Sequence, residues 1–172
     1  MNGGGKNVAD LKQKAAGLAL VVAMSVAGFY EGKTNHAIIP VPGDVPTICR
    51  GHTDGVKLGM TATDRQCNEW FKQDMAIPFR ALDRLVTVPL PETRRGALAS
   101  FIFNVGEGAF ARSTLLKKLN AGDTVGACNE MMRWVNAGGK KLRGLVRRRE
   151  VERGICLLQP EEEPVWKIFL NS

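Results

Sequence analysis

Glu31 and Thr47 are the residues whose types and surroundings point most directly to chemistry. Glu31 follows the apolar run Ala15 to Phe29, and Thr47 comes shortly before the turn-like segment Gly51-His52-Thr53. A carboxyl group at the end of an apolar helix is partly desolvated, which favours its protonated form and suits a proton donor. The two residues therefore predict acid catalysis in which a second polar group orients a small reactant such as water.

Cleavage of a glycosidic bond needs this combination. An acid protonates the leaving oxygen, while a group on the opposite side holds water or stabilises the developing cation. Taken alone, a Glu at a helix end is more often an ordinary surface residue. The catalytic interpretation therefore depends on the segments around it.

Two of those segments, Glu31-Gly32 and Pro46 to Thr53, resemble the active-site signature of phage-type lysozymes, the muramidase endolysins that break the bacterial wall. The similarity continues in the right order through segments 94–106, 113–116, 133–139 and 144–150, and it spans about residues 29–158. It implies a lysozyme-like, mainly α fold of the α+β type. It also implies hydrolysis, with inversion, of the β-1,4 bond between N-acetylmuramic acid and N-acetylglucosamine in peptidoglycan.

By this resemblance, Glu31 is the general acid and Thr47 helps to position the attacking water. The family has a third residue, usually Asp and sometimes Cys, at the position that Pro40 occupies here. The loop before Thr47 is also longer than in the common pattern. Asp44 in this loop either supplies the missing carboxylate or is only a turn residue after Gly43, and both interpretations stay open.

We expect three further residues, His52, Asn104 and Ser113, to contact the substrate. Asn104 suits the N-acetyl groups of a sugar, because an amide both donates and accepts hydrogen bonds, and it also fits a helix C-cap before Gly106. His52 has an alternative role, which we favour, in bracing its turn through hydrogen bonds. Trp134 is predicted to lie in the core and not to serve as a platform for sugar.

The elements that must position these residues are mostly helical. Apolar spacing predicts helices, in chain order, over residues 15–29, 67–85 with an interruption at Pro78, 97–105, 114–119, 123–134 and 141–158. Capping residues predict three of the helix starts, at Thr63 to Gln66, at Ser113 or Thr114, and at Asp123. Thr47 to Leu58 is predicted to form a small hairpin and is the only β candidate. Residues 47–58 therefore form the β part of an otherwise helical protein.

The last predicted helix has an apolar stripe and a basic cluster. We expect it to bury the apolar residues Leu142, Leu145, Val146, Val151 and Ile155. We expect it to leave its basic side chains in solvent, namely Arg147, Arg148, Arg149 and Arg153.

The size and charge of the chain restrict its class. Its 172 residues fit one domain with an appendage, and 44% apolar residues suffice for a core. The net charge of +7 favours polyanionic partners, including an acidic wall. The basic cluster 143–153 contains no aromatic residue, which argues against nucleic acid.

We expect a monomer that acts on peptidoglycan glycan strands without a metal or an organic cofactor. The alternatives are a lytic transglycosylase and a cationic, non-enzymatic protein that permeabilises the wall or membrane.

The 4 cysteines are scattered, without the close pairs of a structural zinc site. They indicate disulfides if the protein is exported and buried thiols if it is not. Of the three possible pairings, we expect Cys49 with Cys67 and Cys128 with Cys156, one in each half of the chain.

The N-terminal run has two interpretations. Ala15 to Phe29 carries no charge but covers only ~22 Å at ~1.5 Å per residue, less than the ~30 Å core of a bilayer. Some similar endolysins use such an Ala- and Gly-rich segment as a signal-arrest-release anchor, which we favour over a first helix of the soluble domain and over a cleaved signal. The predicted parts are 1–28 as basic N-terminus and anchor, 29–158 as catalytic domain, and 159–172 as acidic linker and tail. The protein would be exported, associate transiently with the inner membrane, and then be soluble in the periplasm.

Overall fold

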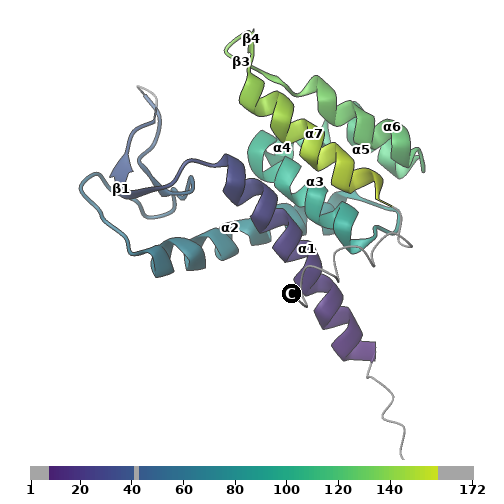
Figure 1. Cartoon of the computed structure of the whole chain (residues 1–172), viewed down its shortest axis with the longest axis horizontal. Coiled ribbons are helices and arrows are strands. Elements are labelled where there is room, and N and C mark those ends of the chain that lie inside the picture. The colour runs from purple at the N-terminus through teal and green to yellow at the C-terminus, as the bar shows by residue number, and fades with distance from the viewer. Residues whose placement is uncertain (1–7, 41–42, 159–172) are drawn as a thin grey trace, which may run out of the picture.

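The computed structural model describes residues 8–40 and 43–158. Residues 1–7 of the expected basic N-terminus and the expected acidic linker and tail at 159–172 lie outside these residues. Most of the described chain is helical, and two small antiparallel sheets complete it (Figure 1). The elements in order are α1 (Val8–Tyr30), β1 (Thr34–Ile38), β2 (Thr47–Cys49), α2 (Asp64–Leu85), α3 (Glu92–Val105), α4 (Glu107–Ala111), α5 (Thr114–Asn120), α6 (Thr124–Glu130), the 3₁₀ turn η1 (Met131–Arg133), β3 (Asn136–Ala137), β4 (Lys140–Lys141) and α7 (Arg143–Leu157). This confirms the mainly α fold class with a small β part.

The molecule has a small lobe built around β1 and β2 and a larger lobe built from α3 to α7. In Figure 1 the small lobe projects to the left, and α1 and α2 run from it towards the helical lobe. α1 packs along α3, which also contacts α2 and α7 and so forms the centre of the helical lobe. The nearly continuous apolar sequence of α3 agrees with this position, because a helix covered on several sides has no wide polar face.

Small residues allow α1 to approach α3 closely. Ala19, Ala23 and Ala27 of α1 are fully buried. Opposite them, a Cβ atom on Gly96 of α3 would come within 2.7 Å of the carbonyl oxygen of Ala19. The small residues of α1 that suggested a membrane anchor therefore also allow its close packing against α3. Among the described residues, no helix combines the length and apolar character needed to cross a membrane.

Three helix starts predicted from capping residues are confirmed. Thr63 and Gln66 form a reciprocal capping box at the start of α2. The side chains of Ser113 and Asp123 accept backbone N–H bonds at the starts of α5 and α6. Two details differ from the predictions. α2 continues through Pro78 without interruption, and α6 ends at Glu130, where η1 follows.

The β structure also differs from the predicted hairpin. β2 pairs with β1, placing Thr34 opposite Cys49 and Ile38 opposite Thr47, so the strand partner precedes Thr47 in the chain. Beyond β2, the 47–58 segment contributes only an isolated bridge between Ile48 and His52. The second sheet, β3 with β4, lies in a region predicted to be helix end and turn. Short strands between turn residues leave too few alternating positions for a clear pattern.

The predicted inward face of α7 is wrong in part, since Leu145, Val146 and Ile155 are half-buried but two other members of the face are not. Leu142 and Val151 are exposed, at 44% and 42%, whereas Arg148 and Arg149 are buried, at 3% and 0%. Glu152 is also fully buried and forms ion pairs with both arginines. Charged side chains are rarely buried unless they are paired, and here each charge has a partner. Glu152 pairs with both arginines from the next turn of α7, and Arg148 also pairs with Glu31 at the end of α1. The apolar stripe of α7 gives no sign of these ion pairs.

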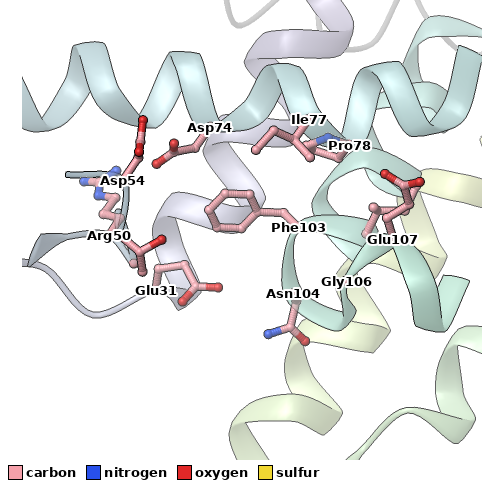
Figure 2. Close-up of a pocket in the computed structure, with 13 residues that line it drawn as sticks. Glu31, Arg50, Asp54, Asp74, Ile77, Pro78, Phe103, Asn104, Gly106 and Glu107 are labelled. Carbon is pink, nitrogen blue, oxygen red and sulfur yellow. The ribbon is translucent and has the colours of Figure 1, made fainter. Parts of the chain in front are cut away.

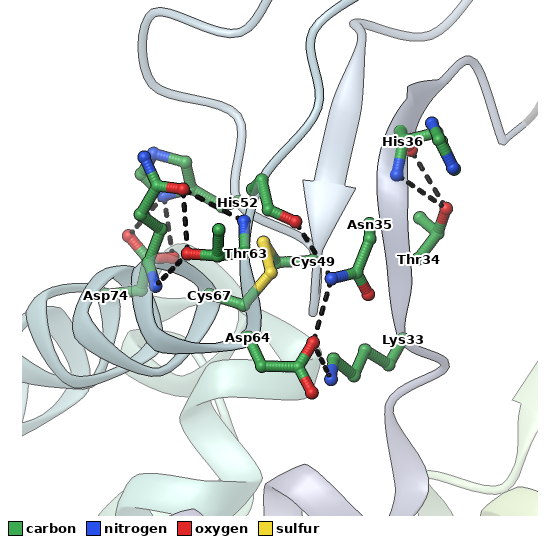
Figure 3. Close-up of a disulfide and its surroundings, with 12 residues drawn as sticks. Lys33, Thr34, Asn35, His36, Cys49, His52, Thr63, Asp64, Cys67 and Asp74 are labelled. Atoms are coloured by element: carbon green, nitrogen blue, oxygen red, sulfur yellow. Dashed lines mark hydrogen bonds and ion pairs between the residues drawn. A yellow bond between two sulfur atoms is a disulfide. The ribbon is translucent and has the colours of Figure 1, made fainter.

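Both expected disulfides are present. Cys49 is bonded to Cys67 and joins β2 to α2, while Cys128 is bonded to Cys156 and joins α6 to α7. Cys49 has a positive φ of 61°, which is uncommon for a residue other than glycine. The first disulfide therefore holds a strained turn immediately after Thr47 (Figure 3).

Candidate active site

Glu31 lies where α1 ends, at the junction of the two lobes. Its backbone N–H donates to the carbonyl of Ala27 at 2.9 Å, so the residue continues the hydrogen-bond ladder of the helix. Its side chain is 26% exposed, and Arg148 Nη1 donates to its Oε1 at 2.6 Å. The carboxyl group is therefore held by a charge-assisted hydrogen bond while it still faces solvent.

The main cleft runs from Glu31 between the small lobe and α2 to α4. It has a volume of about 400 Å³ and is shown in Figure 2. Its lining combines charged and amide side chains with apolar ones, as is usual in pockets that bind and orient a ligand. Its lining comprises Glu31, Arg50, Gly51, Thr53, Asp54, Asp74, Ile77, Pro78, Ile102, Phe103, Asn104, Gly106 and Glu107.

A second hollow, also of about 400 Å³, lies on the strand side of Glu31. Thr47 and Pro40 both line it, together with Lys33 and the backbone of β1 and β2. The Thr47 hydroxyl donates to the carbonyl of Ile38 at 3.3 Å, which leaves its oxygen lone pairs able to accept. Glu31 thus borders the hollow that contains Thr47 as well as the main cleft.

Asp44 does not line either hollow around Glu31 in the described part of the chain. Its side chain is exposed and accepts a hydrogen bond from the N–H of Val45 at 2.9 Å. This local bond is typical of a turn residue. The geometry therefore favours the turn interpretation over the replacement of the missing carboxylate.

His52 is buried and braced. Its ring is 7% exposed, its Nδ1 lies 2.9 Å from Oδ2 of Asp74, and it stacks on Trp70 with ring centroids 4.8 Å apart. Figure 3 shows His52 between the turn after β2 and helix α2. These contacts support the bracing role. They hold in place the turn whose residues Thr53 and Asp54 line the main cleft.

Arg50 ties the same turn to α1. Its guanidinium group lies over the ring of Phe71, 5.3 Å from the centroid. A Cβ on Gly28 would come within 2.6 Å of its Nη1, so a side chain there would displace the guanidinium group from this position. The contact joins β2, α2 and the last turn of α1, the three segments nearest Glu31.

Asn104 is exposed at the end of α3 and lines the main cleft, as expected of a substrate contact. Its Oδ1 accepts a hydrogen bond from Arg149 Nη2. Burial lowers the pKa of Arg149, and the adjacent Glu152 carboxylate opposes that shift. The bond orients the amide so that its NH₂ group is available to a ligand in the cleft.

Ser113 lies away from both hollows around Glu31. Its hydroxyl accepts from the N–H of Leu116 at 3.0 Å and donates to the carbonyl of Phe110 at 2.7 Å, so it caps α5. It lines a separate surface hollow of about 520 Å³ together with Arg112, Glu130 and Trp134. Any contact between Ser113 and a glycan would therefore be distant from Glu31. Trp134 is half-buried and packs edge-on against Phe101, as predicted for a core residue.

Sequence reasoning missed Arg148, Asp54, Asp74 and Phe103. Arg148 is separated from Glu31 by 117 positions, so no local pattern could pair them. Three consecutive arginines in one helix were a usable signal, because α7 turns about 100° per residue and cannot place all three in solvent when the helix is packed. Within the described residues, no group of three or more His, Cys, Asp or Glu is arranged to hold a metal ion.

Comparisons with known proteins agree with this geometry. A family model described as phage lysozyme matches residues 29–152. A SAR-endolysin of Escherichia phage Mu is 43% identical over 155 residues, covering 84% of this chain and 90% of the relative. A SAR-endolysin of Enterobacteria phage P21 is 48% identical over 112 residues, covering 64% and 68%. Among solved structures, a lysozyme of phage P22 has a TM-score of 0.70 at 35% identity, covering 79% of this chain and 95% of that one.

Proposed function

Since this chain belongs to the phage lysozyme family and is a glycoside hydrolase of the muramidase type, we propose that it cleaves the β-1,4 bond between N-acetylmuramic acid and N-acetylglucosamine with Glu31 as general acid. The family supports lytic degradation of the cell wall as its role. The bond, the residues and their roles are the parts that we propose.

The observation that carries the proposal is the placement of Glu31 at the meeting point of two hollows. The main cleft lies along one side of the carboxyl group, and the second hollow places Thr47 on the other side. Glu31 would give its proton to the glycosidic oxygen as that bond breaks. Water held by the Thr47 hydroxyl would attack the anomeric carbon from the opposite side and invert its configuration.

Arg148 has a defined part in this reaction. When Glu31 has given up its proton, the 2.6 Å bond from Arg148 Nη1 stabilises the carboxylate that forms. The same bond holds the other oxygen of Glu31 towards the cleft. Asn104 would orient the sugar by donating from its amide to an N-acetyl carbonyl.

Glu31→Gln tests the proposal. The amide keeps the shape of the side chain but cannot donate a proton as a carboxylic acid does, so we expect turnover of purified peptidoglycan to fall by roughly 10²- to 10⁴-fold. Glu69→Gln, at an exposed position of α2, removes the same charge outside the two hollows and serves as the control. Retained turnover in Glu31→Gln would contradict the role of Glu31, whereas lysis of cells that persists without turnover would support a non-enzymatic, cationic permeabiliser.

A lytic transglycosylase is the second candidate, and Pro40 is the observation that favours it. Pro40 lines the hollow that contains Thr47, and Glu31 is the only acid among its described lining residues. Without a second carboxylate to hold water, the sugar's own hydroxyl could close on the anomeric carbon. Mass spectrometry of the products separates the reactions: reducing ends support hydrolysis, and anhydro-muramyl ends support the transglycosylase.

We also propose that the protein is exported and first held at the inner membrane by its N-terminal helix. The names of its relatives support this, and α1 runs unbroken across residue 28, where the anchor and the catalytic domain were expected to meet. The α1 that packs on α3 would belong to the released, monomeric form. Fractionation of cells expressing the full chain should recover it first with membranes and later as an uncleaved soluble protein. Recovery only from the cytoplasm with free thiols would contradict the proposal.

A further inference from the structure

We propose that Glu152 is a positioning residue that, through two arginines, holds Glu31 and Asn104 at a fixed separation in the cleft. The inference rests on the proposed function, because it concerns how the acid and the substrate contact of that site are held. Glu152 itself is fully buried in α7 and does not touch the cleft.

The two carboxylate oxygens of Glu152 serve different arginines. Oε1 accepts from Arg148 Nε at 3.0 Å and from the hydroxyl of Ser100 at 2.7 Å. Oε2 accepts from Arg149 Nη1. Because adjacent residues of a helix point about 100° apart, the two arginines leave α7 in different directions and are drawn together only by this carboxylate.

Each arginine then ends on one residue of the site. Arg148 Nη1 donates to Glu31 at 2.6 Å, and its Nη2 donates to the carbonyl of Ser100 at 3.1 Å. Arg149 Nη2 donates to the side chain of Asn104. All three edges of the Arg148 guanidinium are therefore occupied, so its planar fork cannot rotate without moving Glu31. Through the two arginines, Glu152 would therefore set the distance between the carboxyl group of Glu31 and the amide of Asn104.

Two guanidinium groups and two carboxyl groups make up this cluster. Arg148 contacts both Glu31 and Glu152, and Arg149 contacts Glu152. Neutralising Glu152 would leave Arg149 without its carboxylate partner and Arg148 with Glu31 alone. The other charged residues that line the hollows around Glu31 are Arg50, Asp54, Asp74 and Glu107 in the main cleft and Lys33 in the second hollow, and they stay unchanged. Loss of Glu152 would therefore remove the support that Arg148 and Arg149 share.

The test compares Glu152→Gln with Glu150→Gln. Both remove one carboxylate from α7, but Glu150 is exposed. With Glu152→Gln we expect kcat on purified peptidoglycan to fall about tenfold and KM to rise, since both site residues lose their shared support. We also expect Glu152→Asp, which keeps a carboxylate at this position, to recover part of the lost kcat. Glu150→Gln should leave kcat and KM as in the unmodified protein.

A folded Glu152→Gln variant with unchanged kcat and KM would show that Glu152 only supports the fold, and would overturn the inference. If the variant does not fold, Ser100→Ala decides, because it removes one hydrogen bond to Glu152 and keeps every charge. We expect its kcat to fall roughly two- to fivefold. An unchanged kcat would contradict the inference. Glu31→Gln separates the two levels: activity in that variant rejects the proposed function, whereas its inactivity beside a normal Glu152→Gln rejects only the positioning role.

Discussion

At the residue scale, the main question is which group holds the attacking water when Pro40 supplies no carboxylate. Pro40 and Thr47 line the same hollow beside Glu31, and by the resemblance to the family Pro40 stands where an acid is usual. Asp44 is close in sequence, yet its side chain is exposed and bonded to its own loop. In the proposed mechanism, the water-holding role therefore falls on the Thr47 hydroxyl.

This division predicts opposite results for two variants. Thr47→Ala removes the hydroxyl that would hold the attacking water, and misplacement of a reactant by about 1 Å can cost roughly 10²-fold in rate, so we expect kcat to fall by about that factor. Asp44→Asn changes an exposed turn residue and should keep activity within about twofold. Initial rates on purified peptidoglycan at one pH measure both. A loss in Asp44→Asn equal to that in Thr47→Ala would show that Asp44 reaches the substrate.

At the element scale, the contact between α1 and α3 decides where Glu31 lies. α1 ends at Tyr30, one residue before the acid, and its alanines are buried against α3. A shift of α1 along α3 would move Glu31 relative to Arg148, which is carried by α7. Close packing of small residues fixes that register, because the backbones meet with little side chain between them.

Gly96→Ala tests this packing. The added methyl group would lie 2.7 Å from both the carbonyl oxygen of Ala19 and the Cβ of Val22, which cannot move aside without shifting α1. We expect a loss of about 1–3 kcal/mol in the free energy of unfolding, measured by urea denaturation, together with lower activity. Gly154→Ala in α7 is the control, since nothing lies within 4 Å of the added Cβ. It should be neutral or stabilising by up to about 1 kcal/mol. Equal effects of the two changes would contradict a tight α1–α3 contact.

At the scale of the whole molecule, each disulfide holds one side of the site. Cys49–Cys67 closes a separation of 18 residues beside Thr47, and Cys128–Cys156 closes one of 28 residues in the helical lobe. The buried side chain of Arg94 also donates to the carbonyl of Cys156 at 2.8 Å, so the end of α7 is held twice. The helix that carries Arg148 and Arg149 is thereby fixed to both α3 and α6.

Replacing either pair by serines should lower the free energy of unfolding by roughly 2–4 kcal/mol, because the unfolded chain regains its freedom. We expect loss of Cys128–Cys156 to reduce kcat as well, since α7 carries the arginines that hold Glu31. Urea unfolding with and without a reducing agent, followed by activity at low urea, measures both effects. Reductant should not change a variant that lacks both pairs, and a stability unaffected by reductant in the unmodified protein would contradict the role of the disulfides.

The sequence by itself was sufficient for the features that depend on local chemistry. Capping residues located the starts of α2, α5 and α6, the nearly continuous apolar run identified the central α3, and the positions of the cysteines led to the observed pairing. The signature around Glu31 and Thr47 led to the family. Each of these signals lies within a few residues of the chain, or in a motif whose order along the chain is itself informative.

Only the tertiary structure decided which charges are buried and what they hold. The arginines of α7 were expected in solvent, yet Arg148 and Arg149 are covered by α1, α3 and η1 because Glu31, Glu152, Asn104 and the Trp134 carbonyl satisfy them. The strand partner of Thr47, the bracing of His52 by Asp74 and the separation of Ser113 from Glu31 are likewise set by distant segments. The physical reason is the same in each case. A charged or polar side chain is stable inside a protein only when its partners are in place, and those partners come from elsewhere in the chain.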